Sequence, residues 1–213
     1  MNSDRLQDHP FWGRRAPLAT LAGIVLLIFS SGRTAYALVV LGALLWHHSL
    51  LILALNAARP VFPQKGRAIA EFFLSGVLNS TYILFLFLLN PFLALETFLY
   101  CLLVPVYSYV SRLPGRLENS EVEDAVIKAA AEALSMGVLI VALALIREPL
   151  GYGSLSLPGG SGGIVRLFVS GESPYFPIRI FAGSAGALIL LGYGAALFNR
   201  LREFKSMAER DSE

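Results

Sequence analysis

The chain has 213 residues, of which 55% are hydrophobic and 15% charged, whereas a soluble domain of this size carries about 25% charged residues. This composition argues against a soluble monomer. The formal net charge of +2 is too small to indicate a nucleic-acid binder. The single cysteine excludes an intramolecular disulfide framework and a self-contained cysteine metal site.

Uncharged stretches mark the helices that cross a membrane, because one crossing needs about 20 mostly apolar residues. Residues 16–32, 34–58 and 72–95 contain no charged side chain, and Glu96 alone interrupts 72–111. The pattern predicts six helices, at about 17–31, 34–56, 69–90, 92–111, 126–146 and 177–199. No strand is evident. The segment 147–176 is rich in Gly, Pro and Ser and is typical of an external loop.

The basic residues predict the orientation of the six helices, because cytoplasmic loops are enriched in Lys and Arg. With six crossings both termini lie on one side, together with 13 of the basic residues, and four lie on the other side. We therefore expect a cytoplasmic segment 1–16, a membrane domain 17–200 and a charged cytoplasmic tail 201–213. The four external residues are Arg33, Arg147, Arg166 and Arg179.

Asn90-Pro91 is a turn signal that divides the chain into halves 17–90 and 91–200, each with three helices. Because each half crosses an odd number of times, the second half enters the membrane from the opposite side. The expected fold is an all-α integral membrane protein built from two inverted three-helix repeats. The first helix of each half is unusual: one is short, and the other carries Glu96 and Pro105. This points to a site at the bilayer midplane, or to a merely short helix and a kink.

An ionisable side chain at membrane depth costs free energy, so each one requires a structural or functional explanation. His47 and His48 project about 100° apart on the second helix and cannot both face one metal, so we favour a neutral histidine hydrogen-bonded to a neighbouring helix over a metal or haem ligand. Glu96 is a candidate for proton or cation movement, or an interfacial carboxylate near a helix N-terminus. Glu132 is expected to snorkel to the cytoplasmic interface, and buried Cys101 to be an inert thiol.

Other local patterns predict structure. Ser120 and Glu123 form a capping box that is expected to start the fifth helix. Small residues four apart in the sixth helix, at 182–187, permit close helix packing. No phosphate-binding glycine loop and no Ser/His/Asp arrangement is evident, so hydrolases and nicotinamide-binding enzymes are poor interpretations, and we expect no catalytic residue.

Two segments resemble a known family. Residues 146–155, Ile-Arg-Glu-Pro-Leu-Gly-Tyr-Gly-Ser-Leu, resemble the Ile-Arg-Glu-x-Leu-Gly-x-Gly-Thr-Leu element of the Rnf/Nqr membrane subunits. Val104-Pro105, Ser111 and the run 115–118, Gly-Arg-Leu-Glu, resemble that family's Ile-Pro-…-Asn-Cys-…-Gly-Arg-x-Glu element without a gap. The resemblance extends over about 17–200. Cytoplasmic termini match the RnfE/NqrD-like branch, whose RnfA/NqrE-like sister subunits have the opposite orientation.

The resemblance implies a multi-pass subunit of the inner (cytoplasmic) membrane. The family's complexes couple electron transfer, from NADH to quinone or between ferredoxin and NAD, to sodium or proton movement. Paired subunits hold an iron–sulfur cluster with two cysteines from each. Here the matching positions fall on or near Gly23 and on Ser111, and neither supplies a thiolate. The resemblance therefore implies that this chain binds no cluster and no other cofactor alone.

Two functions follow from this departure. The first is a diverged subunit or paralogue of an Rnf/Nqr-type complex, accessory rather than catalytic, that serves in assembly or in the ion path beside an RnfA/NqrE-like sister subunit. The alternative is a stand-alone transporter or channel-like protein on the same scaffold, with Glu96, His47 or His48 near its substrate.

The Arg147-Glu148 pair is expected to be an external interfacial ion pair that caps the fifth helix, an interpretation favoured over direct catalysis. Gly151 and Gly153 follow it and are expected to supply the positive backbone angles that turn the chain.

Overall fold

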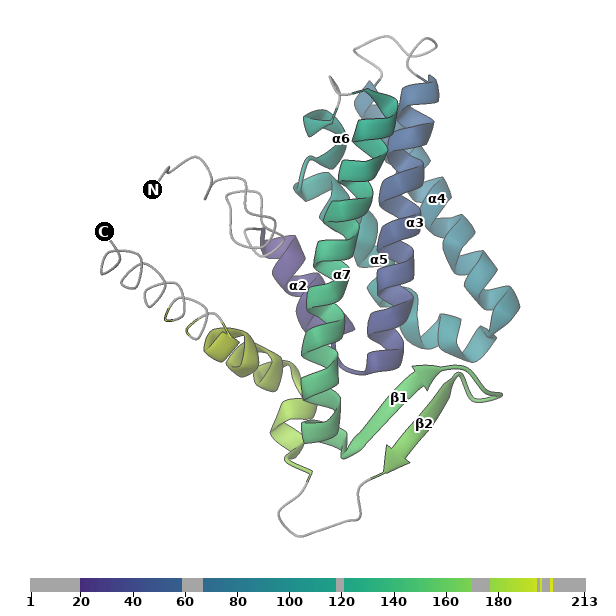
Figure 1. The fold of residues 1–213 in the computed structure, drawn as a ribbon. Coiled ribbons are helices and arrows are strands. Elements are labelled where there is room, and N and C mark those ends of the chain that lie inside the picture. Colours follow the sequence, from purple (N-terminus) through teal and green to yellow (C-terminus); the bar gives the residue numbers. More distant parts are fainter. Residues whose placement is uncertain are drawn as a thin grey trace, which may run out of the picture.

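The computed structural model describes residues 20–58, 67–117, 121–169, 177–194, 196 and 200 (Figure 1). It is mostly helical, as the sequence predicts, and four of its helices are long and apolar enough to cross a membrane. These are α3 (Thr34–Ala58), α4 (Arg67–Leu89), α5 (Pro91–Val110), which continues into the short α6 (Leu113–Arg116), and α7 (Val122–Tyr152).

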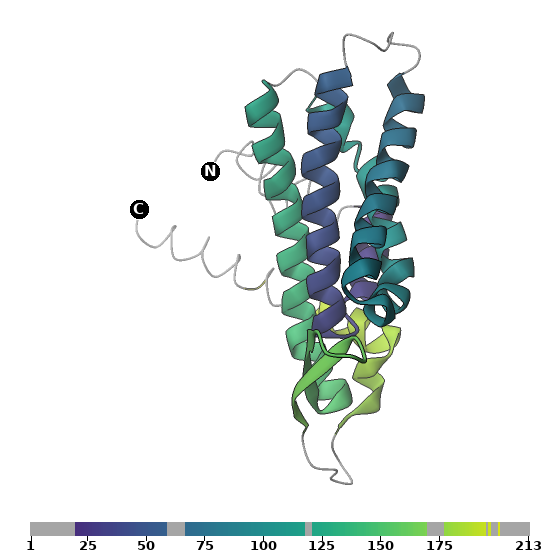
Figure 2. The ribbon, with the colours of Figure 1, turned by 90° about the vertical axis from the view of Figure 1, so that its right-hand side faces the viewer.

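The core of the bundle is the antiparallel pair α3 and α7, which lie side by side along their length (Figures 1 and 2). Small residues make this approach possible, since they let two helix backbones come close. A Cβ atom added to Gly137 would meet Cδ1 of Leu41 on α3. Fully buried alanines recur every four residues on the same helix, at Ala125, Ala129 and Ala133. The helices α4 and α5 form a hairpin that packs against α3, on its side away from α7 (Figure 2).

The first and last predicted crossings are only partly described. The helix α2 (Leu21–Ser30) has ten residues, and a further apolar helix extends over Ser184–Gly194. Both are shorter than one crossing requires. Residues 17–19, 195 and 197–199 of the two predicted helices lie outside the described residues, so the arrangement as two inverted repeats stays a prediction.

Two predictions about helix boundaries were wrong. The fifth helix, expected at 126–146, extends six residues further, to Tyr152, with Pro149 inside its last turns. Its N-cap residue is Glu121, which makes no side-chain capping bond; Ser120 lies outside the described residues. In the sixth helix the small residues at 182–187 straddle a break: the 3₁₀ helix η3 (Arg179–Ala182) ends there, and the next helix begins at Ser184.

The absence of strands was also wrong. The strands β1 (Ser154–Pro158) and β2 (Ile164–Val169) pair antiparallel within the segment expected to be an external loop (Figure 1). Three of the connecting glycines, Gly159, Gly160 and Gly163, have positive φ angles of 150°, 73° and 86°. Such angles are readily available to glycine. The high glycine content of this segment favoured a loop, so the two short runs rich in apolar residues were not predicted to be strands.

The β hairpin defines one end of the bundle, here called the hairpin end. At this end of the bundle also lie the start of α3, the end of α7, η3 and the Asn90-Pro91 turn. Asn90 caps α5, accepting a hydrogen bond from the Leu93 amide at 3.1 Å, and donates one to the Gly160 carbonyl at 2.9 Å. The predicted turn is therefore confirmed, and it is fastened to the β hairpin.

Candidate functional site

The end of α7 buries an arginine in the hairpin end. Arg147 is only 3% exposed, and its guanidinium donates four hydrogen bonds. Nε donates to the Phe181 carbonyl at 2.8 Å and Nη2 to the Ala182 carbonyl at 2.9 Å. Nη1 donates to the Ile28 carbonyl at 2.7 Å and to Oγ of Ser31 at 2.9 Å. One side chain thus ties the end of α2 to η3.

The next residue, Glu148, holds a different element. It is 1% exposed, and its Oε2 accepts a hydrogen bond from the Thr34 amide at 2.7 Å. Thr34 is the first residue of α3, and the N-terminus of a helix presents unpaired amides and a partial positive charge that a carboxylate satisfies. Beside it, the Ala35 amide donates to Oγ of Ser156 on β1 at 3.5 Å.

We call this meeting point of α2, α3, α7, β1 and η3 the arginine junction; its central residues are Arg147 and Glu148. The expected external ion pair is wrong on two counts: both side chains are buried, and they bind different backbone elements rather than each other. The reason is helical geometry, since adjacent residues on a helix point about 100° apart.

The two glycines that follow have separate roles. Gly153 is the C-cap residue of α7 with φ 63°, so the predicted turn is confirmed there. Gly151 was expected to act in the same way, but it lies inside the helix. A Cβ atom at that position would lie 2.5 Å from the Ala182 amide nitrogen. Gly151 is required by the close approach of η3 and not by backbone angle.

Aromatic side chains surround a small cavity of about 190 Å³ next to the arginine junction. The Arg33 guanidinium lies over the Tyr152 ring, 5.1 Å from its centroid, and over the Tyr36 ring at 5.9 Å. The Tyr36 hydroxyl donates to Oε2 of Glu96 at 2.9 Å. Glu96 is exposed at the hairpin end, in the second turn of α5.

The structure does not bring Glu96 and the histidines together. Tyr36, the partner of Glu96, lies 11 residues before His47, or about 16 Å along a helix. His47 Nε2 hydrogen-bonds to Oγ of Ser75 on α4 at 2.8 Å, which confirms the expected bond to a neighbouring helix. His48 instead donates from Nδ1 to the Leu44 carbonyl of its own helix at 2.9 Å. The expectation of an interhelical bond is wrong for His48.

A metal site is not formed by these groups: within the described ranges no three His, Cys, Asp or Glu side chains lie close enough to hold a metal ion. His48 faces the Tyr107 ring, with centroids 5.7 Å apart. The buried ring atoms Nδ1 of His47 and Nε2 of His48 have no hydrogen-bond partner in the described part of the chain.

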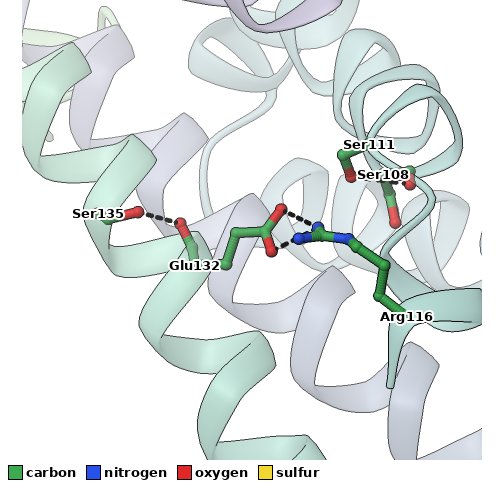
Figure 3. Close-up of polar contacts among 5 residues, drawn as sticks. All are labelled: Ser108, Ser111, Arg116, Glu132 and Ser135. Atoms are coloured by element: carbon green, nitrogen blue, oxygen red, sulfur yellow. Dashed lines mark hydrogen bonds and ion pairs between the residues drawn. The ribbon is translucent and has the colours of Figure 1, made fainter. Parts of the chain in front are cut away.

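A bidentate ion pair joins α6 to α7 at the opposite end of the bundle. Nη2 of Arg116 donates to the two carboxylate oxygens of Glu132 at 2.8 and 2.6 Å (Figure 3). This pair was not predicted from the sequence, because Glu132 was expected to snorkel alone to the cytoplasmic interface. Arg116 belongs to the Gly-Arg-x-Glu element of the resemblance, but that element does not identify Glu132 as its partner.

The two positions where the family carries cluster cysteines lie on the paired helices α2 and α5, which contact each other. The Gly23 amide donates to Oγ1 of Thr20 at 3.1 Å, in the first turn of α2. Ser111 is the C-cap residue of α5, and its Oγ donates to the Ser108 carbonyl at 3.0 Å (Figure 3). Cys101 is buried ten residues before Ser111, about 15 Å along a helix.

A larger cavity of about 690 Å³ lies between α3, α4 and α5. Ser75, Asn79 and Ser108 supply polar groups to its largely apolar wall. Comparisons with known proteins add nothing to this description: no protein-family model and no curated protein matches the chain.

Proposed function

We propose that this chain is an integral membrane subunit, or a paralogue of a subunit, of an Rnf/Nqr-type ion-translocating electron transport complex. It acts in assembly or in the ion path, in the inner membrane with both termini cytoplasmic, and carries no iron–sulfur cluster. The observation that carries the proposal is the arginine junction. The residues of the resembling element meet there: Arg147 and Glu148 bind the ends of α2 and α3, Gly151 lets η3 approach closely, and Gly153 ends α7.

The arginine junction supports the proposal because a fold with a short first helix has helix ends whose backbone groups require partners. The end of α2 and the start of α3 lie within the apolar bundle, where free helix ends must find partners inside the protein. Arg147 serves the first end and Glu148 the second. The two residues that the resembling element shares with the family therefore have a defined structural role in this chain, which supports the proposal.

We propose that the chain carries no cluster because it lacks the required ligands. Iron–sulfur clusters are held by thiolates, and Gly23 and Ser111 offer none. Cys101 is buried on α5 and lies about three helical turns from Ser111. A single thiol in each of two chains is also too few for the four ligands that a cluster requires.

A sister subunit needs a surface on which to dock, and the outer side of the α4–α5 hairpin offers one. Phe72, Leu88, Leu95 and Leu99 are all exposed there. A membrane protein buries such a surface against lipid or against another membrane protein. We propose that the RnfA/NqrE-like sister subunit docks on this side because its apolar side chains, such as Leu88 at 83%, are more exposed than those of α7, such as Leu134 at 48%.

The test is purification of the tagged chain from its native membrane in mild detergent. Co-purification of flavin-bearing or cluster-bearing subunits is the expected result. Leu99→Trp on α5 is expected to reduce it, and Leu134→Trp on the exposed side of α7 serves as the matched control. The isolated chain is expected to show no iron–sulfur absorption in the visible range. Recovery of a homo-oligomer alone, or a chain that carries a cluster by itself, would contradict the proposal.

A stand-alone transporter or channel-like protein is the second candidate, and the 690 Å³ cavity favours it. Its polar lining residues lie at membrane depth, where a substrate pathway requires them. Of the residues proposed near its substrate, His47 bonds to Ser75, which lines this cavity. It predicts that the homo-oligomer moves a solute across the membrane of a liposome, whereas a complex subunit alone does not.

A further inference from the structure

The 690 Å³ cavity contains buried polar atoms that nothing in the described part of the protein satisfies. Oδ1 of Asn79 and Oγ of Ser108 have no hydrogen-bond partner, although their residues are 3% and 1% exposed and both line the cavity. An unpaired buried polar atom is destabilising, and in native proteins it calls for an explanation. A bound molecule with complementary groups supplies one.

The position of these atoms fixes the charge of that molecule. Ser75 and Asn79 lie eight and twelve residues into α4, about 12 and 18 Å from its first residue. At that depth an ionised head group is costly without a partner of opposite charge. Among the described residues that line the cavity, Glu71 alone carries a charge, and it lies nearer the helix start. An anionic head group would find no cation among these lining residues, so we take the head group to be uncharged.

The shape of the cavity fixes the rest of the molecule. Small residues on one face of α4 leave the space open: a Cβ atom added to Gly76 has no other atom within 4 Å. The rim includes the exposed side chains of Phe72, Val106 and Tyr109, so the cavity opens at the outer, apolar surface of the bundle. Its volume falls in the range of about 300–1,000 Å³ that is typical of sites for one small molecule.

We infer that this cavity binds a neutral single-chain lipid whose head carries two or more hydrogen-bonding oxygens, with its hydroxyl groups at Asn79 and Ser108 and its chain among the apolar residues. A monoacylglycerol has this chemistry. Its hydroxyl donates to Oδ1 of Asn79, and the Ser108 hydroxyl donates to a second oxygen of the head. Ser75 also lines the cavity, but its hydroxyl already bonds to His47, so it is not counted among the groups that bind the head.

The inference is tested on the purified full chain in phosphatidylcholine nanodiscs. The probe is a monoacylglycerol with a photoactivatable diazirine in its chain, and the comparison is an alkane with the same diazirine and no head. The monoacylglycerol is expected to label the segments 68–80 and 102–109, and the alkane to label exposed residues of all helices. Equal labelling of the two segments by both probes would overturn the inference.

Variants distinguish binding in the cavity from labelling of the exposed surface. Gly76→Leu fills the cavity and is expected to reduce monoacylglycerol labelling at least tenfold, whereas Gly192→Leu, which also has open space around its Cβ, leaves it unchanged. Asn79→Leu and Ser108→Ala are each expected to reduce it about three- to tenfold, the effect of one lost hydrogen bond. Thr81→Ala, exposed on the same helix, is the control. Unchanged labelling of the Gly76→Leu protein would refute the site, whether or not the chain co-purifies with other subunits.

Discussion

Replacement of Arg147 by methionine tests the arginine junction directly, because methionine keeps most of the side-chain volume and removes every donor. Each hydrogen bond to a charged group contributes about 1.5–3 kcal/mol. The four bonds share one side chain, so their contributions do not add. Removal of one member of a buried charged network costs about 3–5 kcal/mol. We expect a loss of this size, since three carbonyls are left without the guanidinium.

The assay is thermal unfolding of the purified protein in detergent. A loss of 3–5 kcal/mol corresponds to a fall of about 6–20 °C in Tm for a chain of this length. Arg147→Lys is expected to fall between wild type and Arg147→Met, because a single ammonium cannot reach acceptors on both α2 and η3. Arg166→Met on the exposed side of β2 is the matched control, with an expected change within about 0.5 kcal/mol.

A second variant tests whether the two buried charges depend on each other. Glu148→Gln keeps an oxygen that accepts from the Thr34 amide and removes the charge. The double variant Arg147→Met/Glu148→Gln is expected to lose less stability than the two single variants together, since a lone buried carboxylate is no longer left without a nearby cation. The reasoning is refuted if Arg147→Met unfolds at the same temperature as the Arg166→Met control.

Two further predictions concern packing and the opposite end of the bundle. Gly151→Ala is expected to destabilise the protein by about 1–3 kcal/mol, because its Cβ meets backbone atoms of η3; Gly162→Ala, with open space around it, is the control, and equal Tm values contradict the packing role. Arg116→Leu is expected to cost about 0.5–1 kcal/mol in denaturant unfolding, since leucine cannot form the ion pair with Glu132. Lys128→Ala, which breaks an exposed pair one turn apart, is expected to cost less.

The helices with clear boundaries were predictable from the sequence. Charge-free stretches located α3, α4 and α5 within a few residues, and Asn90 lies in the predicted turn and also caps α5, which was not predicted. The boundary of α7 was missed because Arg147 and Glu148 were taken to mark the membrane surface, a rule that holds only for charges that reach water. Buried partners on other elements let the helix continue past both. The β hairpin was missed because its glycine turn outweighed its short apolar strands.

The parts of the site that depend on distant residues were not predictable in this way. Residue types indicated a hydrogen bond from a histidine to a neighbouring helix, and His47 makes one. Nothing in the sequence tells that Arg116 faces Glu132, 16 residues away, or that Ser108 and Asn79 line one cavity. Such groupings arise from how whole helices pack, whereas a periodic pattern reports only which face of one helix is apolar.

The order of the two charges at the arginine junction is itself determined by the chain direction of the helices they serve. A helix end leaves carbonyls unpaired, and a helix start leaves amides unpaired. The end of α2 therefore requires a donor, which Arg147 provides, and the start of α3 requires an acceptor, which Glu148 provides. Exchange of the two residues, Arg147→Glu with Glu148→Arg, keeps composition and net charge but opposes each side chain to the wrong helix end. We expect that protein to be less stable than Arg147→Met, a result that simple charge pairing would not produce.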